Sequence, residues 1–357
     1  MINDYAWLMH KYEIAKTSVS VVGARGYSGL ELVKLLMRHP HADVKYAFAT
    51  GDFTLADGLM ISGLQKIQCL KDTELMSHLT DVVFLATPAE VSHDLAPKIV
   101  AAGKIVIDVS GAFRLKKNDY KKWYGFEHMH LPLLQNAQYG LHPWASPVGG
   151  KAQVVANPGC YATAVAMALV PVIKNKLIDL NTVVVDAKSG ASGAGKKAAE
   201  NLLFTEVDAE CLPYRVGRHQ HYPEIQETIE NLSGVRLDFH FTTSLLPVRR
   251  GIIAGVYANL NTGVTINDVA ETFKKAYQHY SLVEIGSCEE RPQLLQLKKV
   301  VGTGRTHISW TVQGQKLFLF SCIDNLLKGA ASQAVENFNH ILDLPVDLGL
   351  TGLEAQI

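Results

Sequence analysis

Residues 18–38 read SVSVVGARGYSGLELVKLLMR, and this stretch decides the fold. The apolar run at 18–22 has the composition of a buried strand, and the leucine spacing after it is helical as far as Pro40. Between them glycines stand at every third position, where they permit a positive φ and let backbone N–H groups approach a phosphate at a helix N-terminus. We therefore predict a strand, a ligand-binding turn and a helix. A tight turn that serves only close packing is the alternative.

The segments that follow repeat this alternation of strands and helices. Apolar runs at 44–48, 81–86 and 104–109 are the next strand candidates, and 90–102 is a helix candidate. Near-continuous runs of valine and isoleucine are typical of parallel strands that are covered on both faces. The sequence thus predicts an α/β fold with a doubly wound, Rossmann-type parallel sheet, in which residues 1–158 form a dinucleotide-binding domain.

The second half of the chain changes character. Strand candidates are longer and closer together there, at 182–187, 235–243, 251–260 and 307–320. They predict an α+β catalytic or substrate domain over 159–320, with an antiparallel sheet. We expect residues 321–357 to return to the first domain. A last helix is expected at 325–342. Apolar residues spaced three or four apart would share one face of it, namely Leu326, Ala330, Ala334, Phe338 and Ile341.

The composition argues against several classes of protein. The 357 residues exceed one ordinary core, and 34 basic and 34 acidic side chains give a formal charge of zero. This balance favours neither a nucleic acid nor an anionic membrane as partner, and the lysines at 116–122 are expected to be solvated. The N-terminus lacks the pattern of a secretory signal, and no apolar run reaches the ~18 residues of a membrane span. Five scattered cysteines without a CxxC pair suggest neither disulfides nor a zinc knuckle, so we expect a reduced, cytoplasmic setting.

The octapeptide NPGCYATA at 157–164 places one cysteine after a Pro-Gly turn and before a long apolar run. A helix that begins near Cys160 would put the thiol at the positive end of the helix dipole, which stabilises the reactive thiolate. The alternative is a buried, inert cysteine, and the local sequence leaves both open.

The heptapeptide HQHYPEI at 219–225 combines two histidines with a carboxylate. Its spacing matches no trusted zinc-ligand set such as HExxH, so we expect no metal. The functional interpretation is a histidine that transfers protons beside polar neighbours that orient it. Histidines in a surface loop are the alternative.

Two further motifs could contact phosphates. SGASGAGKK at 189–197 fits a P-loop as far as Lys196, but Lys197 stands where magnesium binding needs Ser or Thr. We therefore reject an ATPase and expect a loop beside a cofactor or substrate. Arg114 follows the strand candidate at 104–109, at the sheet edge where ligands bind, and could hold a phosphate or a carboxylate. A structural ion pair of Arg114 is equally compatible with the sequence.

Seven motifs follow one another along the chain, namely GARGYSGLEL, DVSGAFRL, NPGCYATA, SGASGAGKKA, HQHYPEI, LLPVRRGI and NLLKGAASQAVENFN. In this order they resemble N-acetyl-gamma-glutamyl-phosphate reductases, from about residue 18 to residue 342. The resemblance implies NADPH-dependent reduction of a small acyl phosphate, N-acetyl-L-glutamyl 5-phosphate, to N-acetyl-L-glutamate 5-semialdehyde and phosphate in arginine biosynthesis. It also implies a homodimer or homotetramer, with the second domain serving dimerisation.

The resemblance assigns roles to individual residues. Cys160 would attack the acyl phosphate to form a thioester, with His219 as the acid/base and His221 as the fallback. The substrate contacts it implies are Arg114 for the leaving phosphate, Asn157 for the oxyanion, His221 and Glu224 for orientation, and Arg250 for a carboxylate. The cofactor contacts would be Gly23, Arg25, Gly26, Tyr27, Ser28, Gly29, Thr50, Thr87, Ser189, Ser192, Gly193 and Asn325.

The cofactor preference is the point where the sequence departs from the family. Many members carry Ser-Arg after the second strand, where the 2′-phosphate of NADP binds; here Thr50 stands for the serine and the arginine is absent. Asp52 is instead the acidic residue typical of NAD sites, and Arg25 offers a replacement charge. We expect NADP, with NAD as the alternative. The functional alternatives are a reductase of an aminoadipyl or aspartyl type of acyl phosphate and a non-catalytic nucleotide-binding protein of the same fold.

Overall fold

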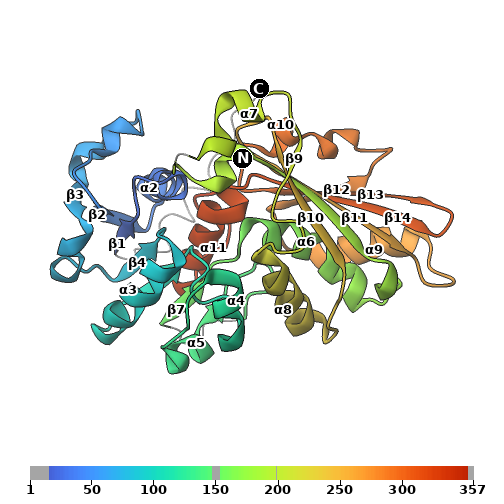
Figure 1. The fold of residues 1–357 in the computed structure, drawn as a ribbon, viewed down its shortest axis with the longest axis horizontal. Coiled ribbons are helices and arrows are strands. Elements are labelled where there is room, and N and C mark those ends of the chain that lie inside the picture. Colours follow the sequence, from blue (N-terminus) through green and yellow to red (C-terminus); the bar gives the residue numbers. More distant parts are fainter. Residues whose placement is uncertain (1–15, 147–152, 198, 353–357) are drawn as a thin grey trace, which may run out of the picture.

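The computed structural model describes residues 16–146, 153–197 and 199–352. Most of the N-terminal extension and the last five residues of the expected returning segment lie outside these ranges. The strands form two seven-stranded sheets, which lie at opposite ends of the long axis (Figure 1).

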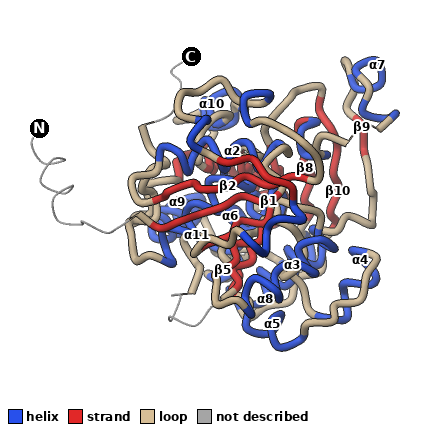
Figure 2. The backbone as a smooth tube through the Cα atoms, turned by 90° about the vertical axis from the view of Figure 1, so that its left-hand side faces the viewer, coloured by secondary structure: helices blue, strands red, loops and turns tan. Residues whose placement is uncertain are grey.

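The first sheet is wholly parallel, with the strand order β3-β2-β1-β4-β5-β7-β6. Its strands are β1 (Thr17–Val22), β2 (Ala42–Ala49), β3 (Gln68–Lys71), β4 (Val82–Leu85), β5 (Ile105–Asp108), β6 (Gln138–Tyr139) and β7 (Val154–Ala156). Alternate residues enter two separate apolar clusters, one shared with α2 (Tyr27–Arg38) and the other with α3 (Ala89–Ala101). Figure 2 shows β1 and β2 next to each other with α2 beside them. The predicted doubly wound parallel sheet is confirmed.

The second sheet is mixed, with the order β12-β13-β14-β11-β8-β10-β9. Its strands are β8 (Val184–Gly190), β9 (Leu212–Pro213), β10 (His240–Leu246), β11 (Ile252–Asn259), β12 (Val283–Ser287), β13 (Thr306–Gln313) and β14 (Lys316–Ile323). One face packs on three helices, α6 (Cys160–Lys174), α8 (His221–Ser233) and α9 (Ile266–Tyr277) (Figure 1). The remaining short helices are α4 (Tyr120–Tyr124), α5 (Leu131–Asn136), α7 (Phe204–Val207) and α10 (Leu297–Val300). No helix among the described residues is both long and apolar enough to cross a bilayer.

Two strand predictions in this half were wrong in extent. The candidate at 235–243 pairs only from His240, because Leu237 and Phe239 pack under α8 and the carbonyl oxygen of Leu237 accepts a hydrogen bond from the Gln226 side chain (2.8 Å). The candidate at 307–320 is two strands, β13 and β14, joined by a turn in which Gly314 has φ +62°. The polar run Gln313-Gly314-Gln315-Lys316 inside this stretch is the turn signal that the prediction of one strand overlooked.

The last helix differs most from its prediction. It opens with a π-helical turn, Leu327–Ala331, continues as α11 (Ser332–Ile341), and lies between the two sheets (Figure 1). The predicted face of Leu326, Ala330, Ala334 and Phe338 is buried, but so are the polar residues on the other sides of the helix, which the spacing did not predict. These buried polar residues are Lys328, Ser332, Gln333, Glu336, Asn337 and Asn339.

Contacts of α11 with the first sheet support our division of the chain into domains, which stays a proposal. The Phe338 ring lies 6.0 Å from that of Phe84 on β4, and Asn339 Oδ1 is 2.7 Å from His39 Nε2 just after α2. These contacts fit a segment that returns to the first domain.

Candidate active site

Cys160 lies on the segment that connects the first sheet to the second, between β7 and β8. After β7 the N–H of Asn157 donates to the carbonyl oxygen of Asp108 (2.8 Å), which extends the parallel pairing by one residue. Gly159 is the N-cap of α6, and Cys160 is its first residue. The thiol therefore stands at the carboxyl edge of the parallel sheet, where α/β proteins bind ligands.

The histidine motif packs directly against this turn. The N–H of Gly159 donates to Glu224 Oε1 (2.7 Å), on the first turn of α8. A Cβ added to Gly159 would lie 2.5 Å from His221 Nε2, so only glycine permits this approach. The fold thus brings together NPGCYATA and HQHYPEI, which the sequence keeps far apart.

A cavity of about 310 Å³ joins the predicted catalytic pair. Cys160, His219 and His221 line it, and Ser189 and Gly193 of the SGASGAG loop close another side. The other residues of its lining are Tyr161, Ala194, Leu202, Tyr214, Arg215, Gln220 and Leu245. The Cys160 side chain is only partly buried, so a small substrate in this cavity could meet the thiol.

Both histidines of the cavity are held neutral. Burial lowers the pKa of His219 to about 2 and that of His221 to about 3. His219 Nδ1 accepts the backbone N–H of His221 (3.1 Å), so the proton of the neutral ring is on Nε2. His221 Nδ1 has no hydrogen-bond partner among the described residues. Hence His219 is set to donate a hydrogen bond, and His221 keeps an unengaged ring nitrogen.

The thiol is not activated in the way the helix dipole predicts. Burial raises the pKa of Cys160 to about 11, the Arg114 guanidinium acts in the opposite direction, and the Glu224 carboxylate adds to the rise. Glu224 accepts the N–H at the very start of α6, so a negative charge already occupies the positive end of that dipole. The backbone N–H groups of Cys160 and Tyr161 do lower the pKa of the thiol, as expected at a helix N-terminus, but burial outweighs them, so the predicted stabilised thiolate was wrong for the protein without substrate.

We expect slow alkylation of Cys160 in the free protein. A raised pKa leaves little thiolate at pH 8, and the reaction should accelerate as the pH rises toward 11. With iodoacetamide at pH 8, followed by peptide mass spectrometry, Cys160 should react at least about tenfold more slowly than the exposed Cys211 of the same molecule. Equal rates at the two cysteines, or a Cys160 rate that is flat above pH 7, would contradict the raised pKa.

Arg114 and Glu224 hold the turn that carries Cys160. Neither is one of the described residues that line the Cys160 cavity. Arg114 donates from Nε to the carbonyl oxygen of Asn157 (2.8 Å) and from Nη2 to that of Val109 (2.7 Å), and Nη1 lies 3.6 Å from Glu224 Oε2. Tyr139 also donates its hydroxyl to Glu224 (2.9 Å). Of the two readings of Arg114, the structural ion pair is the one that the structure forms.

Two other predicted substrate contacts are engaged elsewhere. The Asn157 amide donates to the carbonyl oxygen of Ala330 (3.1 Å) and accepts from Asn337 (3.0 Å). Arg250 pairs with Glu31 Oε1 (2.8 Å) and Asp324 Oδ1 (3.0 Å). Neither residue lines the Cys160 cavity in the described part of the chain.

Sequence reasoning missed Arg215, which does line that cavity. Its backbone has φ +48°, a conformation that residues other than glycine rarely adopt and that is often found at functional sites. Tyr214 beside it donates its hydroxyl to that of Tyr161 (3.0 Å). The sequence signal that could have pointed to Arg215 is its position four residues before His219.

The glycine turn forms a cradle that fits a phosphate. Gly23 has φ +83°, and a Cβ on Gly29 would lie 2.3 Å from the Gly23 carbonyl oxygen. Gly26 is the N-cap of α2, and no side chain of the described residues caps this end, so the first N–H groups of the helix can bind a ligand. A Cβ on Gly23 would lie 3.4 Å from Thr87 Cγ2, which places Thr87, the second residue after β4, at the same edge.

Three further predicted cofactor residues lie in or beside a second cavity, next to the SGASGAG loop. Tyr27 and Ser192 line a second cavity of about 650 Å³, between α2 and the loop after β8, together with Lys196, Lys197, Arg249 and Arg250. Leu202 lines both cavities, so they adjoin. Asn325 donates to Ser192 Oγ (3.0 Å) and accepts from the N–H of Gly251 (2.8 Å), so it holds the SGASGAG loop.

The remaining predicted cofactor residues stand at the glycine turn and just after β2. Arg25 and Thr50 are exposed, and Ser28 is half-buried in the first turn of α2. The turn is tied to β2 because the N–H groups of Gly23 and Ala24 donate to the carbonyl oxygen of Phe48 (2.9 and 3.0 Å).

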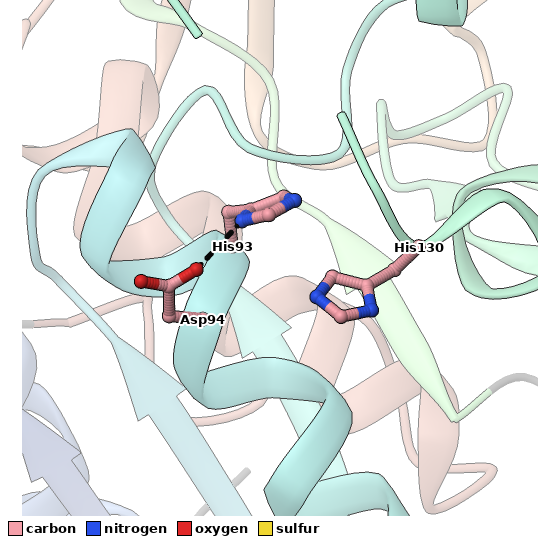
Figure 3. Close-up of side chains that lie close together, drawn as sticks. All are labelled: His93, Asp94 and His130. Atoms are coloured by element: carbon pink, nitrogen blue, oxygen red, sulfur yellow. Dashed lines mark hydrogen bonds and ion pairs between the residues drawn. The ribbon is translucent and has the colours of Figure 1, made fainter. Parts of the chain in front are cut away.

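One group of described residues has the composition of a metal site, namely His93, Asp94 and His130 (Figure 3). His93 Nδ1 lies 2.8 Å from Asp94 Oδ1, and His93 Nε2 accepts the backbone N–H of Met129 (3.1 Å). The ring proton is therefore on Nδ1, facing the carboxylate, and no lone pair of His93 is left for a cation. These contacts favour a hydrogen-bonded pair over a metal site.

Comparison with known proteins agrees with the two-sheet architecture. Residues 18–152 match the family model described as semialdehyde dehydrogenase, NAD binding domain, and residues 160–325 match semialdehyde dehydrogenase, dimerisation domain. A similar solved structure is aspartate semialdehyde dehydrogenase II from Vibrio cholerae, complexed with ASA. It has a TM-score of 0.71 at 18% identity, over 92% of this chain and 98% of that one. This likeness concerns the fold alone.

Relatives with higher identity indicate the family. An N-acetyl-gamma-glutamyl-phosphate reductase of Staphylococcus epidermidis is 37% identical over 93% of this chain and 97% of its own length. The protein of the same name from Brevibacillus brevis is 38% identical over the same shares. With the nucleotide-binding sheet and the cysteine–histidine cavity in place, the chain belongs to the N-acetyl-gamma-glutamyl-phosphate reductase family, oxidoreductases with the domains of semialdehyde dehydrogenases.

Proposed function

We propose that the protein reduces N-acetyl-L-glutamyl 5-phosphate to N-acetyl-L-glutamate 5-semialdehyde and phosphate, the arginine-biosynthetic reaction that the relatives' name describes. The observation that carries the proposal is the cavity lined by Cys160, His219 and His221, which adjoins the cavity beside the glycine turn. When bound there, NADPH supplies the hydride.

Cys160 acts in this scheme as the nucleophile. Its sulfur forms a bond to the acyl carbon, the bond from that carbon to the phosphate oxygen breaks, and inorganic phosphate leaves a thioester behind. Reduction of the thioester gives a hemithioacetal, which releases the aldehyde and returns the thiolate. Because the thiol is protonated at neutral pH, its proton must move before or during attack, and the unengaged ring nitrogen of His221 is the candidate acceptor.

His219 acts as a hydrogen-bond donor to the substrate oxygen through Nε2–H. A neutral imidazole in a buried site can polarise a carbonyl and stabilise the oxyanion that develops in the transition state. This role follows from the Nδ1 contact with the N–H of His221, which places the ring proton on the other nitrogen.

Two variants of His219 separate hydrogen-bond donation from proton transfer. His219→Leu removes the donor and should lower kcat by about 10²–10³-fold. His219→Gln restores an N–H near the position of Nε2 and should retain activity within about tenfold of the wild type, since no proton need leave the residue. Steady-state kinetics between pH 6 and 9 would measure both. If His219→Gln is as impaired as His219→Leu, His219 is a proton-transfer group and the donor role is wrong.

In this scheme an arginine binds the anionic substrate, and the glycine turn binds the pyrophosphate of the cofactor. Arg215 is the cation that lines the catalytic cavity, and we propose that it holds the phosphate or the carboxylate of the substrate. Arg114 then serves the reaction by positioning the turn that carries Cys160. We propose NADP as cofactor, with the cradle of Gly23, Gly26 and Gly29 at its pyrophosphate.

We also propose a homodimer or homotetramer. The face of the second sheet opposite α6 presents the half-buried side chains of Tyr257, Phe318 and Phe320, which pack edge to face. An aromatic sheet face of this kind fits a subunit interface, and the matching family model is described as a dimerisation domain.

The reverse reaction tests the proposed activity. N-acetylglutamate semialdehyde with NADP should give NADPH only when phosphate is present, because phosphate must release the acyl group from the thioester. Aspartate semialdehyde and the aminoadipate semialdehyde derivative, offered at equal concentration, should be poorer substrates. Turnover of one of these in preference would replace the proposed substrate. Turnover that is independent of phosphate would remove the acyl-phosphate step.

A further inference from the structure

The sheet register places a lysine beside the position where the family carries its arginine. β2 and β3 are parallel, and Ala49, the last residue of β2, pairs with Lys71, the last residue of β3. Neighbouring strands lie about 4.8 Å apart, so the chain after β2 leaves the sheet next to Lys71. The glycine turn is bonded to the end of β2 through the carbonyl oxygen of Phe48. The turn, Thr50 and Lys71 therefore share one edge of the sheet.

The acidic residue that suggests NAD is not free at this edge. Asp52 Oδ1 lies 3.2 Å from Lys71 Nζ, and the Asp52 side chain is 92% exposed. Such an exposed pair is weak, so either partner can exchange the other for a better ligand. Asp52 can swing into solvent, whereas the backbone of Lys71 is fixed by its place in the sheet.

The other nearby carboxylate does not compete for the Lys71 ammonium. Glu74 accepts the backbone N–H of Lys71 (3.1 Å), as part of the cap of the short helix that follows β3. Among the described residues, Asp52 is therefore the carboxylate that pairs with Lys71 Nζ.

We propose that Lys71 selects NADP by binding the 2′-phosphate of its adenosine ribose, and that Asp52 is the anion which this phosphate displaces. A phosphate with up to two negative charges and three acceptor oxygens is a stronger partner for an ammonium than an exposed carboxylate. NAD offers a ribose hydroxyl at this place and gains nothing from the exchange. The inference rests on the proposed NADP dependence and names the residue that produces it.

Binding of fragments in the absence of substrate tests the inference without relying on turnover. Calorimetric titration of the full-length protein with 2′,5′-ADP, 5′-AMP, NADP and NAD gives the contribution of the 2′-phosphate to affinity. In the wild type, NADP and 2′,5′-ADP should bind at least about tenfold more tightly than NAD and 5′-AMP. Lys71→Met should remove this difference while leaving NAD and 5′-AMP unchanged. Asp52→Asn should tighten binding of NADP and 2′,5′-ADP severalfold, since it removes the competing anion.

The same sheet offers a matched control. Lys45 and Asp43 on β2 form another exposed lysine–aspartate pair, with side chains 50% and 42% exposed. Lys45→Met should leave all four affinities unchanged. Arg25→Met tests the arginine of the glycine turn, which is the other cation available for the 2′-phosphate.

Each contrary outcome is distinct. Loss of discrimination in Arg25→Met with Lys71→Met unaffected would assign the 2′-phosphate to Arg25 and overturn the proposal. Equal loss of NADP and NAD affinity in Lys71→Met would also overturn it. A wild type that binds NADP and NAD equally would overturn it while leaving the acyl-phosphate reduction intact. Discrimination that depends on Lys71 in a protein inactive on the proposed substrate would uphold it while the proposed reaction fails.

Discussion

Cys160→Ser should lower kcat/KM of phosphate-dependent NADP reduction by at least about 10³-fold, which corresponds to about 4 kcal/mol of activation free energy. A serine hydroxyl is a much weaker nucleophile than a thiol, and it holds its proton more tightly. The hydroxyl would also form an ester in place of the more reactive thioester. The change is nearly isosteric, so NADP affinity and the midpoint of thermal unfolding should remain those of the wild type.

Cys211→Ser is the matched control, because Cys211 is exposed and does not line the catalytic cavity. It should retain full activity. Acid-quenched mass spectrometry of wild type mixed with the acyl phosphate should show an added acyl group on Cys160, and none in the variant. Substantial turnover by Cys160→Ser would exclude the thioester route.

Lys328→Met should lower the free energy of unfolding by about 3–5 kcal/mol, as is usual when one partner of a buried ion pair is removed. Lys328 Nζ lies 2.9 Å from both carboxylate oxygens of Glu336 and 2.5 Å from the Tyr280 hydroxyl, and Lys328 and Glu336 have no exposed side-chain surface. Burial lowers the pKa of Lys328 and raises that of Glu336, so each charge depends on the other. Methionine fills the space of the lysine stem and leaves the carboxylate without its cation.

Urea unfolding at pH 7.5 would measure this loss. The double variant Lys328→Met/Glu336→Leu should recover most of it, because the uncompensated charge is gone. Lys274→Met removes the exposed partner of Glu271 and should leave the unfolding midpoint unchanged. A loss below about 1 kcal/mol in Lys328→Met would show that the pair is solvated in the native state.

The Lys328–Glu336 pair also bears on the active site. It joins the π-helical turn to α11, and a Cβ on Gly329 of that turn would lie 2.6 Å from Cys160 Cβ. The carbonyl oxygen of Ala330, in the same turn, accepts the amide of Asn157. Loss of the pair should therefore reduce kcat as well as stability, with the double variant separating the two effects.

Local order along the chain was enough to predict the first sheet. The strand, the glycine turn and the helix of residues 18–38 lie next to each other in the sequence. Glycine is required at 29 by the backbone of the same turn, and at 23 by a positive φ. The order of the seven motifs indicated the family for the same reason, since each motif is continuous. Cys160 and His219 were singled out locally, and the structure places them on one cavity.

What the sequence by itself determined is therefore the α/β architecture, the position of the turn and the identity of the candidate nucleophile. Only the tertiary structure decided the electrostatics of the site. The raised pKa of Cys160 arises from burial and from Glu224, the engagement of Arg250 from Glu31 and Asp324, and the burial of α11 on all sides from both sheets. These effects depend on residues that are distant in the sequence, and desolvation and ion pairing exist only once the fold has brought the groups together and excluded water from them.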